Sequence, residues 1–378
     1  MKALFLIFHR LAPHNGISKK IISQFNALLE LGLEIELCHQ SYSDNIHKRY
    51  VGDTLIKNYG GGIWGKIYKR IEYNTIVKYV LENNIKYIYA RYDHNANPLT
   101  VRLFKKLRDA GTWIDLEIPT YPYDREYLQQ GLKFKAELFI DKLFRRKLAR
   151  YVNRIITFSD YGEIFGVKTL KISNGIDFES IKVKEAFNKE YNTLNLIGVA
   201  DIHYWHGFDR MVAGMVNYYS GEMPVKVVFN IVGGGCKNEL ERIREIADKG
   251  KISSYVKFWG PKSGEELDKL FDVADFGVAS LGRHRSGITK IRTLKTREYA
   301  ARGIPFAYSE IDDDFENMPY VLKVPPDETP VDILSIVKFC ADNKFTPAEI
   351  RSSVEMNLSW KAQMKRVVTV LNTGNGRG

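Results

Sequence analysis

The segment LKTREYAARGIP, residues 294–305, has the residue types expected of a phosphate-binding helix start. It predicts a short helix with Lys295, Thr296 and Glu298 near its N-terminal end. Free backbone N–H groups and a partial positive charge favour a phosphate there. A carboxylate on the same turn can accept hydrogen bonds from sugar hydroxyls. The pattern therefore favours a site for a phosphate next to a polyol, although an ordinary capped helix with a surface glutamate fits the same residues.

Glycine-rich turns follow two of the predicted strands. In HNGISKKI, residues 14–21, Gly16 allows a tight turn that brings backbone N–H groups close to a ligand. In VGGGCKN, residues 232–238, Gly234 and its neighbours could pass beside a diphosphate. Each segment could equally be a plain strand-to-helix turn. Neither a G-x-G-x-x-G nor a Walker sequence is present, which counts against nicotinamide cofactors and ATP.

Polar side chains crowd the exit of another predicted strand. The segment GVADIHYWHGFDR, residues 198–210, places Asp201, His206 and Arg210 just after that strand. A histidine at a helix start beside a phosphate is a plausible hydrogen-bond donor. The alternative is a histidine with a purely structural role.

Basic side chains precede the opening helix, and an acidic run follows it. SLGRHRSGITKIR, residues 280–292, contains Arg285 and Lys290, whose charges would neutralise a diphosphate leaving group unless the loop is merely solvated. EIDDDF, residues 310–315, is interpreted as a solvated loop. Three consecutive carboxylates point in different directions, whereas a divalent metal needs convergent ligands, so no metal site is predicted.

Strand-like apolar runs alternate with helical periods along the whole chain. The pattern begins with KALFLIF and EIELC and restarts near residue 193 with TLNLIGVA. This alternation predicts an α/β protein made of two doubly wound parallel-sheet units in tandem, with ligands at the carboxyl ends of the strands. We place the first domain at residues 1–172, completed by a C-terminal helix at 357–373, and the second at 173–356.

Length, charge and cysteine content restrict the class of protein. The 378 residues suggest two domains. Residues 1–170 hold 27 Lys and Arg against 17 Asp and Glu, whereas residues 171–378 hold 29 against 28, so the first half is expected to meet an anionic partner. Three cysteines without metal or redox spacing favour a reducing cytosol. Without a signal peptide or a run of about 18 apolar residues, the chain is expected to be cytoplasmic.

Two segments of the basic half mix aromatic, aliphatic and basic residues. They are IWGKIYKRIEYNTIVKYV, residues 63–80, and LKFKAELFIDKLFRRKLARYVNR, residues 132–154. Basic amphipathic helices bind anionic membrane surfaces. The alternative is two core helices with solvated outer faces. No nucleic-acid recognition motif is present.

Taken together, the motifs resemble a known family. ISNGID, WHGFDR, VGGG, VKFWG and LKTREYAARGIP occur in the order seen in GT-B fold glycosyltransferases of family 4. DLEIPTYPYDRE, GISKKI and RYDHN look like a branch from bacterial capsular and exopolysaccharide loci. The resemblance spans nearly the whole chain and implies two Rossmann-like domains with a cleft between them. It implies retaining, metal-independent transfer from a nucleotide-sugar, most often UDP- or GDP-linked, to a lipid-linked or growing glycan at the inner membrane face, without a cofactor.

Some positions match that family and others depart from it. Glu298 matches the glutamate that holds the ribose hydroxyls of the donor, while Lys290 stands where a second glutamate contacts the donor sugar. Asp201 and His206 stand where members place an Arg and a Lys on the diphosphate. The resemblance thus implies a donor site in the second domain, with altered contacts.

These departures shift the predicted roles to other residues. Lys295 with Arg285 is predicted to neutralise the leaving diphosphate, with His206 assisting. Glu117 stands where many relatives have a His near the reacting sugar, and could align the acceptor hydroxyl or stabilise oxocarbenium-like charge. The predicted acceptor residues are Arg91, Asp93 and Tyr121.

Two alternative functions stay open at this point. One is a nucleotide-sugar epimerase of the same fold, which would not need a basic, membrane-facing first half. The other is a catalytically inactive subunit that binds a glycan or a partner enzyme, since a family glutamate is missing at Lys290.

Overall fold

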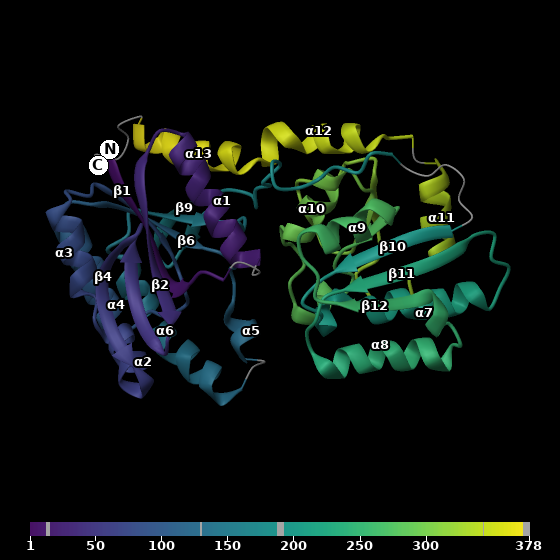
Figure 1. Ribbon diagram of the computed structural model, residues 1–378, viewed down its shortest axis with the longest axis horizontal. Coiled ribbons are helices and arrows are strands. Elements are labelled where there is room, and N and C mark those ends of the chain that lie inside the picture. Colours follow the sequence, from purple (N-terminus) through teal and green to yellow (C-terminus); the bar gives the residue numbers. More distant parts are fainter. Residues whose placement is uncertain (13–15, 129–130, 187–192, 343, 373–378) are drawn as a thin grey trace. The chain divides into compact units, whose positions relative to one another are not determined.

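A computed structural model describes the chain as two compact units (Figure 1). Unit 1 is Met1–Ser173 together with Trp360–Gly378, and unit 2 is Asn174–Ser359. Both combine helices with a sheet of mainly parallel strands, which confirms the predicted α/β class. The described residues are 1–12, 16–128, 131–186, 193–342 and 344–372.

Unit 1 is built on a sheet with the strand order β4-β3-β2-β1-β5-β6-β7-β9-β8. Residues 3–7 of β1 are fully buried, as expected for an apolar strand that helices cover on both faces. Because β1 lies between β2 and β5, the order of the strands reverses there. The strands are β1 (Lys2–Arg10), β2 (Glu34–Ser43), β3 (Ile46–Val51), β4 (Thr54–Gly61), β5 (Tyr87–Arg91), β6 (Trp113–Ile118), β7 (Arg154–Thr157), β8 (Glu163–Ile164) and β9 (Val167–Lys171).

One edge of this sheet departs from the predicted strand–helix alternation. There β3 pairs antiparallel with both β2 and β4. Asp44 and Asn45 join β2 to β3 with φ angles of 52° and 59°. Two-residue turns with positive φ match the twist of a hairpin, and Asp and Asn adopt them more readily than most residues. The Asp-Asn pair was therefore the sequence signal for this hairpin.

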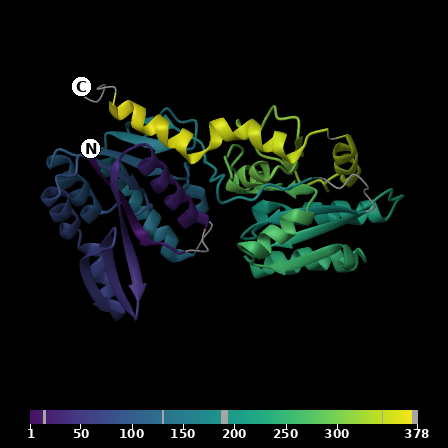
Figure 2. The same ribbon diagram turned by 45° about the horizontal axis from the view of Figure 1, so that its top comes forward.

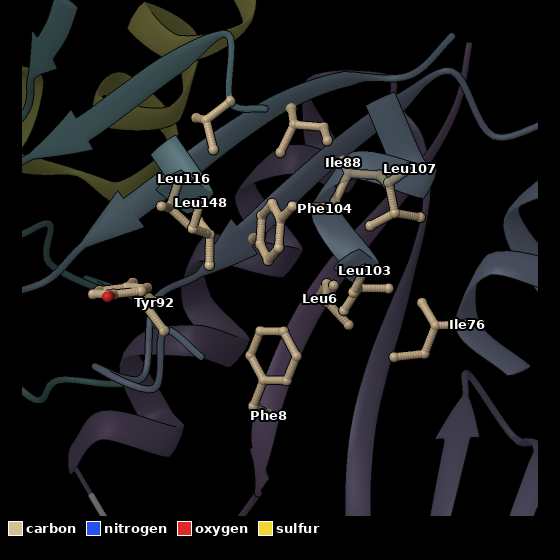
Figure 3. Packing of buried hydrophobic residues seen from close by; sticks show 14 of the residues in the cluster. Leu6, Phe8, Ile76, Ile88, Tyr92, Leu103, Phe104, Leu107, Leu116 and Leu148 are labelled. Carbon is tan, nitrogen blue, oxygen red and sulfur yellow. The ribbon is translucent and has the colours of Figure 1, made fainter. Parts of the chain in front are cut away.

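Helices cover both faces of the sheet in unit 1. On one face, Leu103, Phe104 and Leu107 of α4 pack with Leu6 of β1 and Ile88 of β5 (Figure 3). On the other face, α13 lies beside α1 in both views (Figures 1 and 2). The helices are α1 (Gly16–Glu30), α2 (Gly62–Ile71), α3 (Asn74–Glu82), α4 (Pro98–Asp109), α5 (Asp124–Leu128), α6 (Leu132–Ala149) and α13 (Trp360–Asn372).

Unit 2 holds a sheet of parallel strands in the order β12-β11-β10-β13-β14-β15. The strand order reverses at β10, which lies between β11 and β13. The strands are β10 (Thr193–Val199), β11 (Lys226–Val232), β12 (Val256–Gly260), β13 (Phe276–Val278), β14 (Phe306–Tyr308) and β15 (Val321–Lys323). The helices are α7 (Phe208–Tyr219), α8 (Lys237–Lys249), α9 (Glu265–Val273), α10 (Leu294–Arg302), α11 (Ile333–Asp342) and α12 (Pro347–Leu358), with short 3-10 turns η1 (Tyr204–His206), η2 (Ser253–Tyr255) and η3 (Arg283–Ser286).

Candidate functional site

Polar side chains follow the carboxyl ends of the strands in unit 2, next to the reversal at β10. Open α/β sheets bind ligands at such a point. Glu310 comes soon after β14, Arg283 follows β13, and Lys295 lies in the first turn of α10. His206 ends the short turn η1 that follows β10. We call His206, Arg283, Lys295 and Glu310 the strand-end site.

Burial and neighbouring charges shift the pKa values of two residues in the strand-end site. Burial lowers the pKa of the Lys295 ammonium, Arg283 lowers it further, and Glu310 opposes the shift. Burial raises the pKa of the Glu310 carboxyl, against the positive charges of Arg283 and Lys295. Neither carboxylate oxygen of Glu310 has a hydrogen-bond partner among the described residues. Two cations thus share one poorly solvated carboxylate, an arrangement suited to receive an anion.

His206 is arranged as an uncharged hydrogen-bond donor. Its Nδ1 accepts a hydrogen bond from the backbone N–H of His203 at 3.0 Å, so the proton of the neutral ring lies on Nε2. Burial, followed by the positive charges of Lys295 and Arg283, lowers the pKa of His206 well below its usual value. At neutral pH the ring therefore offers an N–H to a phosphate without adding charge.

The sequence places Glu310 in a loop that is expected to be solvated, but the structure buries it. Its exposed fraction is only 2%. The available signal was its position soon after the apolar strand β14, at the edge where ligands bind. Glu310 is thus a candidate residue that sequence reasoning missed.

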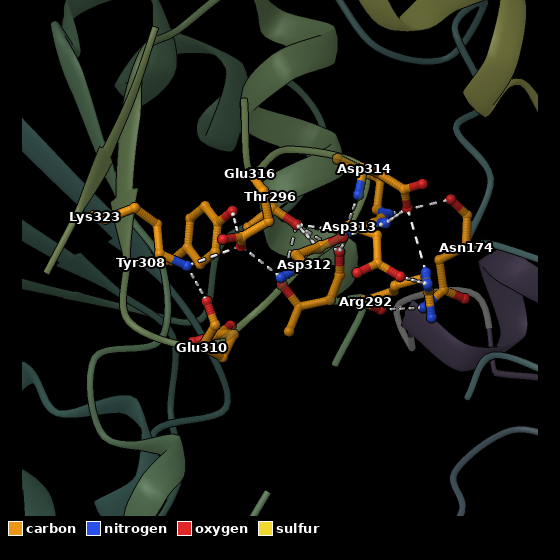
Figure 4. Close-up of polar contacts among 12 residues, drawn as sticks. Asn174, Arg292, Thr296, Tyr308, Glu310, Asp312, Asp313, Asp314, Glu316 and Lys323 are labelled. Atoms are coloured by element: carbon orange, nitrogen blue, oxygen red, sulfur yellow. Dashed lines mark hydrogen bonds and ion pairs between the residues drawn. The ribbon is translucent and has the colours of Figure 1, made fainter. Parts of the chain in front are cut away.

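The acidic run after Glu310 forms ion pairs, which corrects the prediction of a solvated loop. Asp312 and Asp314 both accept hydrogen bonds from Arg297. Asp313 accepts from Arg292 at 2.5 Å (Figure 4). Asp312 is 1% exposed, so at least this carboxylate is buried and not solvated. The three acidic side chains are therefore neutralised by Arg297 of α10 and Arg292 of the loop before it.

Lys290 and Asp201, two of the residues that depart from the family pattern, lie in different environments. The Nζ of Lys290 is 2.7 Å from a carboxylate oxygen of Asp313, so a donor sugar would compete with an ion pair. The side chain of Asp201 is 81% exposed, and its Oδ2 lies 3.3 Å from Nε2 of His203. Of these two predicted donor residues, Asp201 is the more accessible.

The helix α10 carries both Lys295 and Glu298. Residues three apart lie on the same side of a helix, so the two side chains are neighbours. Glu298 is 29% exposed, and its Oε1 accepts hydrogen bonds from Nε and Nη2 of Arg302 at 3.1 and 3.0 Å. Thr296, by contrast, is fully buried. The predicted ribose contact of Glu298 therefore stays compatible with its position.

Two arginines predicted to bind the donor hold loops in place instead. The guanidinium of Arg285 donates two hydrogen bonds of 2.9 Å to Asp209 and two, of 2.9 and 2.5 Å, to Glu328. Arg210 is 2% exposed and donates to backbone carbonyl oxygens of the surrounding loops. Because these donors are already used, the structure favours a structural role for both residues. Arg283 takes the place of Arg285 in the strand-end site.

Close backbone contacts explain two glycines of the VGGG segment. Gly233 has a φ of 131°, and a Cβ there would lie 1.8 Å from the carbonyl oxygen of Ala200. Gly235 has a φ of 134°, and its Cβ would lie 2.3 Å from the backbone of Ile202. Gly234 is under neither constraint, and its approach to a diphosphate stays a prediction.

Glu117 of unit 1 lies in a buried charge cluster at the end of β6. It is fully buried and accepts hydrogen bonds from Gln24 at 2.5 Å and Tyr89 at 2.6 Å. It also pairs with Arg91 and, at 3.6 Å, with Lys20. Its side chain exposes no surface that a substrate could contact in this structure. The geometry therefore favours a positioning role over the predicted catalytic role, and Arg91, predicted to face the acceptor, is one of its partners.

We expect Glu117→Gln to destabilise unit 1 at neutral pH by about 1–3 kcal/mol, because Lys20 and Arg91 lose their counter-charge while one acceptor oxygen remains. Burial raises the pKa of Glu117, but these cations and its hydrogen bonds outweigh it, and the pKa lies below its usual 4.5. The contribution is therefore complete above that value and is lost as the pH falls through the lowered folded-state pKa. Urea unfolding at several pH values measures it.

The matched control is Glu82→Gln, since Glu82 is 60% exposed and, among the described residues, forms an ion pair only with Lys78 at the surface. We expect this control to change stability by less than about 0.5 kcal/mol. A difference between wild type and Glu117→Gln that did not shrink in acid would contradict the assignment.

Three further predicted residues of unit 1 occupy separate positions. Tyr121 packs edge-on against Tyr161, with ring centroids 4.9 Å apart. Asp93 is 45% exposed and lies 3.6 Å from Nδ1 of His9. Gly16 begins α1, and a Cβ on it would meet no atom within 4 Å. The preceding part of its predicted turn, residues 14 and 15, lies outside the described residues.

Comparisons with known proteins identify the fold. No family model matches the chain, and no curated protein matches it in sequence. Sucrose-phosphate synthase from Thermosynechococcus elongatus superposes with a TM-score of 0.70 at 14% identity, covering 100% of this chain and 99% of that one. HepE from Anabaena in complex with UDP gives 0.63 at 13%, with coverages of 99% and 100%. The lipopolysaccharide outer core galactosyltransferase WaaB gives 0.55 at 12%, with coverages of 98% and 100%. The fold is therefore GT-B.

Proposed function

We propose that the chain is a retaining glycosyltransferase. It moves a sugar from a UDP- or GDP-linked donor to a lipid-linked or growing glycan in bacterial surface polysaccharide synthesis, with the donor in unit 2 and the acceptor in unit 1. The observation that carries the proposal is the strand-end site, where Arg283, Lys295 and a neutral His206 gather at the reversal in strand order. The GT-B fold, and the UDP and UDP-glucose bound in solved structures of HepE, support the same class of donor.

The reaction needs negative charge to be stabilised on the leaving group. When the bond between the sugar and the phosphate breaks, the diphosphate keeps the electron pair. Arg283 and Lys295 would stabilise that charge, and the Nε2–H of His206 would donate a hydrogen bond to it. These groups supply the positive charge that a metal ion supplies at many phosphate sites, so the proposal includes neither a metal nor a cofactor.

A donor screen tests the proposal. The purified chain is mixed with UDP- and GDP-sugars, and a donor at about 100 times its Kd should stabilise it by about 2.7 kcal/mol in thermal unfolding. Transfer to a glycan acceptor is followed by mass spectrometry, and proton NMR of the anomeric position checks retention. Epimerisation of the donor without an acceptor would instead indicate an epimerase. Binding without hydrolysis or transfer would indicate an inactive subunit.

We expect Glu298→Ala to weaken binding of the preferred nucleotide about 10–150-fold. Hydrogen bonds to a charged group contribute about 1.5–3 kcal/mol, and the ribose hydroxyls would lose them. Calorimetry compares the nucleotide with its 2′,3′-dideoxy analogue. Wild type and the control Glu265→Ala, altered at an exposed position in α9, should prefer the ribonucleotide, whereas Glu298→Ala should not. Equal discrimination by all three proteins would rule out a ribose contact.

Two helices of unit 1 expose apolar side chains among basic ones. In α2, Trp64 is 81% exposed, and in α6, Leu132 and Phe139 are 85% and 64% exposed. The predicted basic segment 63–80 is divided between α2 and α3. Within the described ranges, no helix has the length and apolar composition needed to cross a bilayer. We include in the proposal a peripheral position on the inner face of the cell membrane, held by these helices on anionic lipid.

We expect replacement of both Ile63 and Trp64 by Ser to weaken binding to phosphatidylglycerol vesicles about tenfold or more, because each large apolar side chain contributes about 1.5–3 kcal/mol when fully buried. Co-sedimentation measures the binding, with phosphatidylcholine vesicles for comparison. The control replaces Val273 and Met356 of unit 2, which are 57% and 86% exposed. Equal losses in the two double variants would contradict a membrane role for α2.

A further inference from the structure

Unit 1 contains a pocket of about 600 Å³, within the size range of small-molecule sites. It lies where β1, β2 and β5 end, beside the reversal in strand order at β1, which is the position where open α/β sheets bind ligands. Residues 8–10 from the end of β1, 40–42 from β2 and 93–97 after β5 form one side. Side chains of β3, α2, α5 and α6, together with Tyr73 between α2 and α3, complete the lining.

Basic side chains outnumber acidic ones around this pocket. The lining includes Arg10, Lys69, Arg70 and Lys133, against only Asp93 and Glu137. Burial and the nearby positive charges of Arg70 and Arg10 lower the pKa of Lys69. These cations disfavour one another's charge, and Asp93 and Glu137 are the only acidic side chains of the pocket lining among the described residues, so an anion in the pocket would be stabilised.

Three histidines line the same pocket, and each has a ring nitrogen without a partner. Nε2 of His9, His47 and His94 is buried and makes no hydrogen bond with the described residues. His47 is 6% exposed, so its ring is almost entirely out of water. A buried polar atom that is left unpaired destabilises the folded protein, and a hydrogen bond to a ligand atom would remove that penalty.

His94 shows what these nitrogens offer to a ligand. Burial lowers its pKa to about 4, so the ring is neutral at physiological pH. The hydroxyl of Tyr127 lies 3.0 Å from Nδ1 and can donate to it, which leaves the ring proton on Nε2. The ring also stacks on Tyr123, with centroids 3.9 Å apart, so its orientation is held. Nε2 is then a fixed N–H donor, suited to an oxygen acceptor.

From this combination we infer that the pocket of unit 1 binds a phosphate or diphosphate group, held by Lys69, Arg70 and the unpaired ring nitrogens of the histidines, with the Nε2–H of His94 as a donor. Phosphate oxygens accept several hydrogen bonds at once and favour cationic donors. Phe8, Tyr42 and Tyr73 line the rest of the pocket and suit a sugar ring or a prenyl chain next to the phosphate. The inference rests on the proposed function only in calling this ligand the acceptor.

The same chemistry could come from a lipid-linked diphosphate or from a soluble sugar phosphate. Geranyl diphosphate serves as the soluble probe for the first source and glucose 6-phosphate for the second. Each is titrated calorimetrically into the full chain without any donor. We expect at least one probe to bind, with an affinity that falls as salt is raised.

Pocket variants locate the binding. Lys69→Gln with Arg70→Gln should weaken the bound probe about tenfold or more, and His47→Phe should do so without changing the charge. The control pair, Lys105→Gln with Arg108→Gln, removes the same two charges from the exposed side of α4 and should bind like wild type. Thermal unfolding checks that each variant is folded. If His47→Phe does not fold, the Lys69→Gln, Arg70→Gln pair still tests the inference.

A diphosphate could also bind to the strand-end site of unit 2, so Lys295→Met is titrated in parallel. Binding that survives in Lys295→Met and is lost in the pocket variants supports the inference. Binding lost in Lys295→Met but kept in the pocket variants overturns it, as does equal loss in the control pair or no binding of either probe. The donor screen is independent of these titrations, so a failure of this inference is distinguishable from a failure of the proposed function.

Discussion

Lys295→Met is expected to reduce kcat for sugar transfer by about 10²–10³-fold, the effect of removing one preorganised group that stabilises charge in a transition state. Lys295 is a half-buried cation beside Arg283 and His206, at the strand ends where a diphosphate would lie. Met keeps the length and apolar stem of the side chain and removes only the charge. Initial rates with a saturating donor measure the loss.

Stability separates this catalytic effect from misfolding. Because burial disfavours the charged form of Lys295, replacement by Met should leave the thermal midpoint unchanged or raise it. The control is Lys249→Met, since Lys249 is 80% exposed and, in the part of the chain that the structure describes, forms an ion pair only with Glu245 at the surface. A stable Lys295→Met protein with wild-type turnover would remove Lys295 from the mechanism.

Arg297→Met is expected to destabilise unit 2 by about 3–5 kcal/mol, the usual cost of removing one partner of a buried ion pair. The Arg297 guanidinium is 1% exposed and donates hydrogen bonds to Asp312 and Asp314, and to the backbone oxygen of Asn174 at 3.3 Å. Without it, Asp312 becomes a buried carboxylate that forms no ion pair with any other described residue. Urea unfolding, followed by circular dichroism, measures the loss.

A surface arginine provides the control for this prediction. Arg244→Met alters an exposed guanidinium that stacks on Phe258, and should cost less than about 1 kcal/mol. Adding Asp312→Asn to Arg297→Met should recover part of the stability, because the unpaired charge is then removed. Additive losses in the double variant would show that the two residues do not interact.

The type and order of most elements could be predicted from the sequence. Long apolar runs such as KALFLIF and VKVVFNIV became β1 and β11, because strands covered on both faces need apolar side chains at every position. The alternation of such runs with helical periods was enough for the α/β class. The β3–β4 hairpin was missed, since its half-buried strands lack a continuous apolar run.

The candidate site could be located but not resolved by the same reasoning. A strand end can be predicted from the sequence, so the segments that hold Lys295 and His206 could be identified as polar segments near strand ends. The sequence did not show which cationic side chain forms an ion pair with which carboxylate. Arg285 and Arg283 are two residues apart, yet Arg285 binds Asp209 and Glu328, while Arg283 influences Lys295 and Glu310.

By itself, then, the sequence determined the elements of this protein, their α/β class and the edges where polar residues gather, because hydrophobic periodicity is a local property. Only the tertiary structure decided which charged side chains bind one another. It buried Glu117, paired Asp312 with Arg297 and left the carboxylate oxygens of Glu310 without a hydrogen-bond partner in the described residues. Charge pairing depends on contacts between distant segments and on removal from water, and neither is encoded in the spacing of residues along the chain.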